Sequence, residues 1–269
     1  MSSPQSKPMV NRLLELLPGG DRRRMLTGCE AVELGFADVV YTLGDRLSHV
    51  YFPTGCFISL IMPIDASAAL EVGMVGAEGM FGLPLALGVD VSPVRAVVQG
   101  AGSALRMDAA TFRRELARSE ALQRQIDRYV FVQLSQLAQT AACTRFHVVE
   151  ARLARWLLMT QDRAGSGKFH VTQEFLAYML GVRRVGVTKA ASSLQARRLI
   201  RYSRGNITVL NRRGLKAAAC GCYRADLESY DRMLGQPFSR SRRDASAGSD
   251  ALTSNGVTSL PESRPAFPP

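Results

Sequence analysis

A basic segment near residue 185 contains the side chains whose types and spacing best suit a defined chemistry. The run GVRRVGVTKAASSLQARR has the spacing of a helix from about Arg183 to Arg197. Its inward-facing apolar residues would be Val187, Ala191 and Leu194. The side chains left facing outward would be those of Arg183, Arg184, Val185, Thr188 and Lys189. Arginine can pair with guanine and valine can contact the methyl group of thymine, so this face predicts reading of base edges in the DNA major groove.

A shorter helix is expected just before this one. Thr172 is a favoured N-cap residue, and Glu174 follows in the first turn, where the helix dipole favours an acid. Gly181 supplies the backbone freedom that a sharp turn between the two helices requires. Thr172 and Gln173 would then lie where backbone N–H groups of the first helix meet a DNA phosphate.

A pair of strands is expected after the second helix. Leu199–Tyr202 and Ile207–Leu210 flank the turn-forming residues 203–206, which predicts a wing. Arg201 and Arg204 would meet the sugar–phosphate backbone from this wing. The alternative is a helical hairpin with a solvated basic face, since arginine is common on helix surfaces. The turn glycine, the inward periodicity and the basic strand pair together favour DNA binding.

These residues carry a resemblance to a known family. The run LGVRRVGVTKAASSLQARRLIRYSRGNITVL resembles the winged helix-turn-helix of the Crp/Fnr family of bacterial transcription regulators. Upstream, VYFPTGCFISLI and EVGMVGAEGMFG resemble the sensor β-barrel of that family, which has the cyclic-nucleotide-binding fold. The resemblance implies a homodimer that places one recognition helix per subunit in adjacent major grooves of double-stranded DNA. It also implies allosteric control by an unknown signal, and we expect RNA polymerase as a further partner.

The distribution of charge agrees with a DNA-binding C-terminal half. The net charge of the 269-residue chain is +11. Residues 1–146 contain 14 basic and 14 acidic residues, whereas residues 147–234 contain 16 and 6. The excess of positive charge is therefore concentrated in the segment that contains the two helices, as expected for a polyanionic partner.

The N-terminal half has the pattern of many short strands. From Cys29 onward, apolar residues alternate with polar ones between turn residues, and further strands are expected at Ala68–Val75, Pro93–Val98 and Gly102–Met107. Gly44-Asp45 is expected to form the turn of a tight hairpin. Such a pattern predicts a sandwich or barrel of jelly-roll type.

Binding of a cyclic nucleotide by this barrel is not expected. Nucleotide-binding members of the family place a glutamate on the ribose and an Arg-Ser or Arg-Thr pair on the cyclic phosphate. In this chain Met80 stands where the acid should be, and Ser92-Pro93 stands near the expected pair. Glu78 and Arg95 are the candidate effector-binding residues if the register differs, and a solvated loop acid and a strand-edge base are the favoured alternative.

No metal site or cofactor is expected from the sequence. The five cysteines form neither a disulfide framework nor a zinc pattern, and scattered free thiols fit a reducing cytoplasm. The only close pair is Cys220-Gly221-Cys222, and two ligands do not make a site. The oxygen-sensing branch of the family holds an iron–sulfur centre with N-terminal cysteines, but only Cys29 lies there. The three histidines, His49, His147 and His170, form no suggestive pair for haem.

Helices are expected to join and flank the two halves. Asn11–Leu17 and a helix capped by Asp21 would precede the barrel, and Asp108–Leu116 would follow it. A long helix from Ser119 to about Phe146 has an apolar stripe that resembles a dimerisation seam, although it could instead pack on its own barrel. Val149–Arg163, which contains Trp156, would pack in the core of the DNA-binding domain. Residues 213–234 are expected to be helical.

The predicted fold class is α+β, with a jelly-roll-type β-barrel, a long dimerisation helix and a C-terminal winged helix-turn-helix. The expected domains are N-terminal helices (1–27), the sensor barrel (28–118), the dimerisation helix (119–146), the winged helix-turn-helix (147–234) and a disordered tail (235–269). The start of the chain has no signal-peptide core and no run of about 18 apolar residues occurs, so a cytoplasmic protein is expected.

The predicted function is sequence-specific DNA binding by a transcription regulator. No Ser-His-Asp order and no phosphate-binding loop occurs in the sequence, so catalysis is not expected. A cyclic-nucleotide-binding interaction module without a direct DNA role is the alternative.

Overall fold

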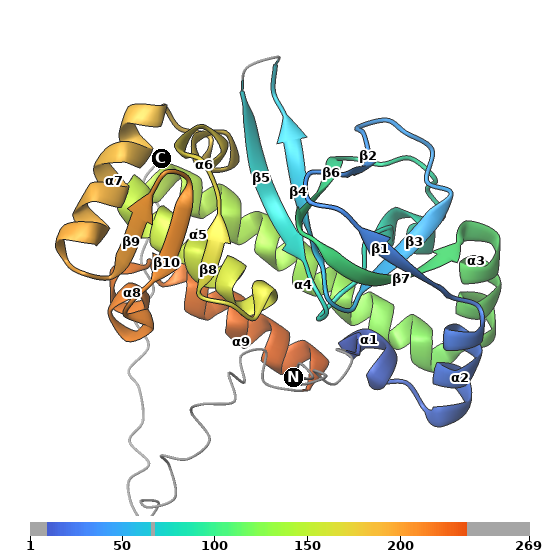
Figure 1. Cartoon of the computed structure of the whole chain (residues 1–269). Coiled ribbons are helices and arrows are strands. Elements are labelled where there is room, and N and C mark those ends of the chain that lie inside the picture. Colours follow the sequence, from blue (N-terminus) through green and yellow to red (C-terminus); the bar gives the residue numbers. More distant parts are fainter. Residues whose placement is uncertain (1–9, 66–67, 236–269) are drawn as a thin grey trace, which may run out of the picture. The chain divides into compact units, whose positions relative to one another are not determined.

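The structure is a computed structural model that describes residues 10–65 and 68–235. The predicted tail therefore lies outside the described residues, apart from its first residue. Figure 1 shows a β-rich N-terminal half and a mostly helical C-terminal half. The predicted α+β class is confirmed.

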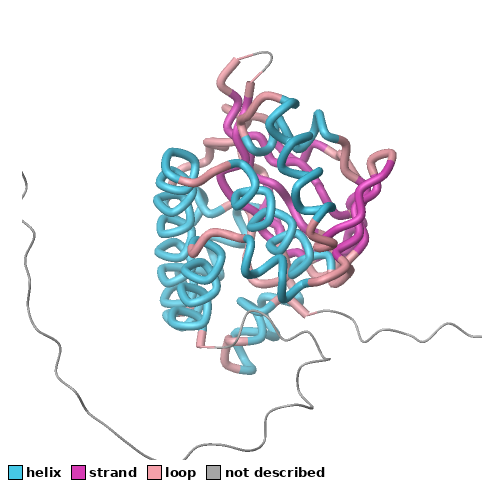
Figure 2. The backbone as a smooth tube through the Cα atoms, turned by 90° about the vertical axis from the view of Figure 1, so that its left-hand side faces the viewer, coloured by secondary structure: helices cyan, strands magenta, loops and turns pink. Residues whose placement is uncertain are grey.

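Two antiparallel sheets form the N-terminal half. Their strands are β1 (Glu30–Leu34), β2 (Val39–Tyr41), β3 (His49–Pro53), β4 (Phe57–Pro63), β5 (Ala69–Val75), β6 (Arg95–Gly100) and β7 (Gly102–Asp108). One sheet has three strands in the order β1-β7-β3, and the other has four in the order β2-β6-β4-β5. Apolar side chains from both sheets share one core, which includes Phe52, Ile58, Ala96 and Met107. Figure 2 shows the strands of the molecule in magenta, with helices in cyan beside them.

The predicted hairpin at Gly44-Asp45 is wrong. Asp45 N–H does close a turn on the carbonyl of Thr42. However, β2 pairs with β6 whereas β3 pairs with β7, so the two strands on either side of the turn enter different sheets. The turn residues indicate a local reversal, but they carry no information on which distant strand each flank will join.

Short helices surround the sheets. They are α1 (Arg12–Glu15), α2 (Gly19–Thr27), the 3-10 helix η1 (Leu83–Leu87) and α3 (Ala109–Arg118). Asn11 caps α1 and Asp108 caps α3, each by accepting a hydrogen bond from a backbone N–H. Asp21 was expected to cap the second helix, but Pro18 is its N-cap and Asp21 lies in its first turn.

The long helix α4 (Glu120–Phe146) is present as predicted, with Ser119 as its N-cap. Its predicted apolar stripe divides into two sets. Leu122, Ile126 and Tyr129 are buried against the sheets of the same chain. Leu134 and Leu137 instead remain exposed.

The winged helix-turn-helix segment is also present. Its elements are α5 (Val149–Ala164), β8 (Lys168–His170), α6 (Gln173–Leu180), α7 (Arg184–Ala196), β9 (Ile200–Ser203) and β10 (Asn206–Val209). The strands form a three-stranded sheet in the order β8-β10-β9. The predicted helix over residues 213–234 is interrupted at Ala219–Gly221, which separates α8 (Arg212–Ala218) from α9 (Cys222–Leu234). Figure 1 shows α9 running beside α4, with which it makes extensive contact.

None of the helices in the described residues has both the length and the apolar composition that crossing a membrane requires.

Candidate nucleic-acid interface

The first helix of the pair begins and ends where the sequence predicts. Thr172 Oγ1 accepts a hydrogen bond from the N–H of Phe175 at 3.1 Å, which caps α6. Gly181 follows α6 with φ +60°, a left-handed conformation that glycine adopts without strain. The sharp turn that this glycine makes brings the start of α7 beside the start of α6.

One face of α7 is buried and the opposite face is exposed to solvent. The buried residues are Val187, Ala190, Ala191 and Leu194. The exposed residues include Arg183, Arg184, Val185, Thr188 and Lys189, as predicted. Within the described part of the chain, no salt bridge joins any cation of this face to a carboxylate. These positive charges are therefore available to a polyanion.

Gln173 and Thr188 connect the two helices. The hydroxyl of Thr188 lies 2.8 Å from Gln173 Oε1 and 3.0 Å from the carbonyl oxygen of Arg184. A hydroxyl has one proton to donate, so it can satisfy only one of these acceptors at a time. This contact ties the N-terminal turns of α6 and α7 together, which orients the exposed face of α7 relative to the cap at Thr172.

The wing is a tight hairpin between β9 and β10. Arg204 and Gly205 form its turn with φ +49° and φ +79°, which matches a two-residue turn of type I′. Arg201 pairs with Thr208 across the two strands, and both Arg201 and Arg204 are exposed. The turn is shorter than the predicted one, but it places both arginines on the wing.

Tyr202 holds the wing against the helices. Its hydroxyl donates to the carbonyl of Val171 at 2.8 Å, and its N–H donates to Gln195 Oε1 at 2.7 Å. Burial raises the pKa of Tyr202, and the nearby charge of Arg184 opposes that effect. The phenol therefore stays protonated as a donor, and the wing has a set position beside α6 and α7.

The two candidate effector residues lie in different surroundings. Glu78 is 4% exposed and forms an ion pair with Arg163 of α5 at 2.7 Å, so the expectation of a solvated loop acid is wrong. Arg95 is the first residue of β6. No hydrogen bond or ion pair joins Glu78 to Arg95 in the described residues, so the two do not form one site here.

Helix α5 contains buried arginines that the sequence analysis missed. Arg155 pairs with Asp226 of α9 at 2.7 Å, and Arg152 donates to the carbonyl of Leu180. Burial alone would lower the pKa of Arg163, but the charge of Glu78, together with Tyr230 and Asp162, outweighs burial and raises the pKa. The only available signal was the spacing of residues 152, 155 and 163, which places them on the same face of α5 as Trp156.

Trp156 packs in the core as predicted, and it also contacts the sheets. Its indole N–H donates to Glu71 Oε1 of β5 at 3.0 Å. Burial raises the pKa of Glu71 to about 7, against the opposing hydrogen bond from Ser59. A partly neutral carboxyl therefore lies between the β-rich half and α5.

The expectation that the cysteines are scattered is wrong for three of them. Cys143 near the end of α4, Cys220 just before α9 and Cys222 at the start of α9 lie together with His147. Their ligand atoms all lie within 4.8 Å of one another. The i,i+4 spacing of Cys143 and His147 at the end of a predicted helix was a signal for half of this cluster.

Comparison with known proteins supports the assignment of the C-terminal half. Residues 151–218 match the model of the Crp-like helix-turn-helix domain. This range begins within the first turn of α5 and ends with α8, so it includes the capped turn, the exposed face of α7 and the wing. No curated protein matches the chain.

Solved structures show the same fold over most of the chain. One is a protein of Eubacterium rectale described as a transcriptional regulator of the Crp/Fnr family, with 15% identity, a TM-score of 0.62, and coverage of 77% of this chain and 96% of that chain. FixK2 of Bradyrhizobium japonicum has 14% identity, a TM-score of 0.61, and coverage of 71% and 98%. The c-di-GMP-responsive regulator CLP of Xanthomonas campestris has 17% identity, a TM-score of 0.60, and coverage of 71% and 99%.

Three findings define a DNA-binding protein of the winged helix-turn-helix class. They are the helix pair with its exposed basic face, the wing beside it, and the match to the Crp-like domain. The β-rich half before it completes the fold of the Crp/Fnr regulators. The chain therefore contains a Crp-like helix-turn-helix domain for DNA binding, and most of it has the fold of the Crp/Fnr transcription regulators. This assignment disfavours the alternative of an interaction module without a DNA role.

Proposed function

We propose that the protein binds a specific operator as a homodimer and that α7 reads the bases. The observation that carries the proposal is the exposed face of α7, which lies within the Crp-like domain and pairs with no carboxylate among the described residues. Arg184, Val185 and Lys189 lie in the first two turns of this helix, the part of a recognition helix that reaches base edges. Thr188 would contact the bases through its methyl group, because its hydroxyl already has acceptors within the protein.

The remaining predicted residues suit the DNA backbone. Thr172 and Gln173 lie at the N-terminus of α6, where free N–H groups and the helix dipole attract a phosphate. Arg183 is the N-cap of α7 and lies at the edge of its exposed face. Arg201 and Arg204 extend from the wing toward the same partner. Such contacts fix the register of a duplex and supply affinity that decreases with salt.

Dimerisation is supported by an exposed apolar face on α4. Phe131, Leu134 and Leu137 are 52%, 59% and 44% exposed and follow one another at a spacing of three residues. Large apolar side chains that gather on one helix face favour burial against a partner. A second copy of the chain would cover this face with its own α4, and the resulting two-fold axis would give two recognition helices for a symmetric operator.

Control by a signal is proposed to act through α5. Glu78 and Glu71 belong to the β-rich half, and their partners Arg163 and Trp156 both belong to α5. A change in the sheets that altered either contact would move α5 and with it the recognition helix. The signal thereby shifts the dimer between arrangements that match the operator and arrangements that do not. RNA polymerase is the proposed further partner, because a transcription regulator acts on the polymerase or on its access to DNA.

The experiment is selection of bound sequences from a random duplex pool with the full-length protein, at near-physiological salt and without added ligand. We expect enrichment of a two-fold symmetric motif. The double variant Arg184→Ala/Lys189→Ala serves as the control, since it removes exposed side chains only and should still fold while losing the motif.

Two outcomes would contradict the proposal. Enrichment of a motif without two-fold symmetry would argue against the dimer. Binding without any enrichment, both with and without added cyclic nucleotides, would show that the basic domain holds DNA by charge alone.

A further inference from the structure

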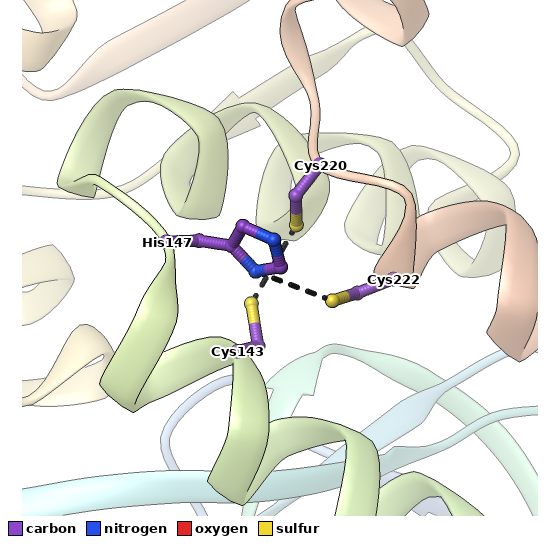
Figure 3. Close-up of side chains that lie close together, drawn as sticks. All are labelled: Cys143, His147, Cys220 and Cys222. Atoms are coloured by element: carbon purple, nitrogen blue, oxygen red, sulfur yellow. Dashed lines mark hydrogen bonds between the residues drawn. The ribbon is translucent and has the colours of Figure 1, made fainter. Parts of the chain in front are cut away.

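Four potential metal ligands converge where the dimer helix meets the DNA-binding domain. Cys143 lies in the last turn of α4, and His147 is the C-cap residue of the same helix. Cys220 precedes α9, and Cys222 is the first residue of α9. Figure 3 shows the three thiols and the imidazole pointing toward one another from these two segments.

The distances fit one ion held by all four groups. Tetrahedral zinc, with Zn–S bonds of about 2.3 Å and Zn–N bonds of about 2.0 Å, separates two sulfur ligands by about 3.8 Å and a sulfur from a nitrogen by about 3.5 Å. Here Cys143 Sγ and Cys220 Sγ are 3.5 Å apart, and Cys222 Sγ and His147 Nδ1 are also 3.5 Å apart. An iron–sulfur cluster, with several metal atoms inside its ligand shell, requires thiolates that are further apart.

We propose that Cys143, His147, Cys220 and Cys222 form a structural site for a thiophilic divalent ion of the zinc class. Three thiolates and one imidazole are a ligand set that zinc takes in closed, four-coordinate structural sites. No ligand position remains for water or substrate, so the site stabilises structure rather than catalysing a reaction. Binding replaces the thiol protons by the metal, and those protons are released to solvent.

The surroundings of the cluster suit a metal–thiolate centre. Gln139 Nε2 donates a hydrogen bond to Cys222 Sγ at 2.9 Å, as outer-shell groups do for thiolate ligands. Three thiolates around one divalent ion leave one negative charge. Arg155, which also pairs with Asp226, lies beside Cys143 and offsets part of this charge.

The place of the site gives it a structural consequence. Cys143 and His147 end α4, immediately before α5 begins at Val149. Cys220 lies in the break between α8 and α9, and Cys222 begins α9. A bound ion would therefore fasten three places to one point: the end of the dimer helix, the connection into the DNA-binding domain, and the helix that packs back on α4.

The test begins with the full-length protein purified under reducing conditions. Elemental analysis should find about one zinc ion per chain. Replacement of zinc by Co²⁺ should give the strong visible absorption of a tetrahedral thiolate site. A chelator should lower the melting temperature, and added Zn²⁺ should restore it, because an ion that binds only the folded state stabilises that state.

Substitutions at the exposed ligand separate metal binding from folding. His147 is exposed, so His147→Ala should leave the fold intact and lower the affinity for Zn²⁺ about 100-fold or more, beyond the effect of losing an outer-shell group. His147→Cys retains four ligands of a type that zinc accepts and should restore binding. Gln139→Ala should weaken binding by about tenfold. Cys29→Ser, which changes a cysteine outside the cluster, is the matched control and should bind as the parent does.

Three results would overturn the proposal. The first is a protein that takes up Zn²⁺ and Co²⁺ no better than its His147→Ala and Cys222→Ser variants. The second is iron with acid-labile sulfide, which would assign the cysteines to a cluster. The third is a disulfide between Cys143 and Cys220, mapped by mass spectrometry, that forms quantitatively in the presence of excess Zn²⁺.

Discussion

The surface of α7 and the buried face of α5 both contain arginines, but they use them in opposite ways. On α7, Arg184 is exposed and has no carboxylate partner among the described residues. On α5, Arg155 and Arg163 are buried, and each is held by a carboxylate from a distant part of the chain. The same residue type therefore serves an external polyanion in one region and internal cohesion in the other. Exposure and pairing, rather than charge alone, separate the two roles.

The largest expected effect concerns the buried pair. Glu78→Ala leaves the Arg163 guanidinium in the interior without its carboxylate, which should cost about 3–5 kcal/mol of unfolding free energy. Denaturant unfolding measures this loss. Glu150→Ala is the control, because it removes the partner of Arg197, whose side chain is 49% exposed, and should cost at most about 1 kcal/mol.

A double substitution sharpens this result. Glu78→Met with Arg163→Met removes both charges and should recover much of the stability, because an apolar replacement of a buried pair is often tolerated. The single variants at Glu78 and Glu150 could instead lose equally little unfolding free energy. The buried face of α5 would then be as well solvated as the surface, and the two regions would not differ in how they use arginine.

Glu71 makes the buried region sensitive to pH. Burial raises the pKa of Glu71 to about 7 in the folded protein, from an ordinary value of 4.5. Between these two values the folded state binds more protons than the unfolded state, so the contribution of Glu71 to stability decreases as pH rises through the window. Across the window this contribution should change by about 2–3 kcal/mol.

Glu71→Gln isolates that contribution. Unfolding free energies of the parent and the variant, measured from pH 4 to pH 8, should show a parent curve that falls relative to the variant as pH rises. Parallel curves would mean that the pKa of Glu71 is the same in the folded and the unfolded protein. A substitution on α7, such as Lys189→Gln, should leave the pH profile unchanged.

Arg184→Ala tests the exposed region through DNA affinity rather than through stability. It should cost about 1–3 kcal/mol of binding free energy at the specific operator and leave unfolding unchanged, because the side chain contacts solvent in the free protein. Arg23→Ala, at an exposed position on α2, should alter neither quantity. Equal losses on specific and random duplexes would reassign Arg184 to a phosphate contact.

The sequence predicts the exposed region better than the buried one, and the reason is physical. Thr172 as a cap, Gly181 as a turn and the outward face of α7 all depend on residues within a few positions of each other. The local periodicity is therefore sufficient to place them. The short wing turn differs from the prediction only in length, because Arg204 adopts a positive φ that the sequence does not indicate.

The buried region depends on contacts between distant residues. Glu78 and Arg163 are 85 positions apart, as are Glu71 and Trp156. Cys143 and Cys220 are 77 positions apart. No local pattern in one sequence indicates such a pairing. The sequence therefore predicts Glu78 in solvent and the cysteines scattered. The prediction of a hairpin at Gly44-Asp45 is wrong for the same reason, because strand pairing depends on contacts throughout the sheet.

Thr172 gives the smallest effect and lies where the two roles meet. It belongs to the exposed surface, yet its hydroxyl caps α6 by accepting from Phe175 N–H. Thr172→Ala should cost about 1 kcal/mol of unfolding free energy, whereas Thr172→Ser keeps the acceptor and should cost less. A phosphate contact at this end of α6 would add a loss of DNA affinity that is equal for all sequences.

Unchanged stability in the alanine variant would contradict the cap. Unchanged affinity would make Thr172 a structural residue on an otherwise DNA-binding surface, and recognition would then rest on α7 and the wing.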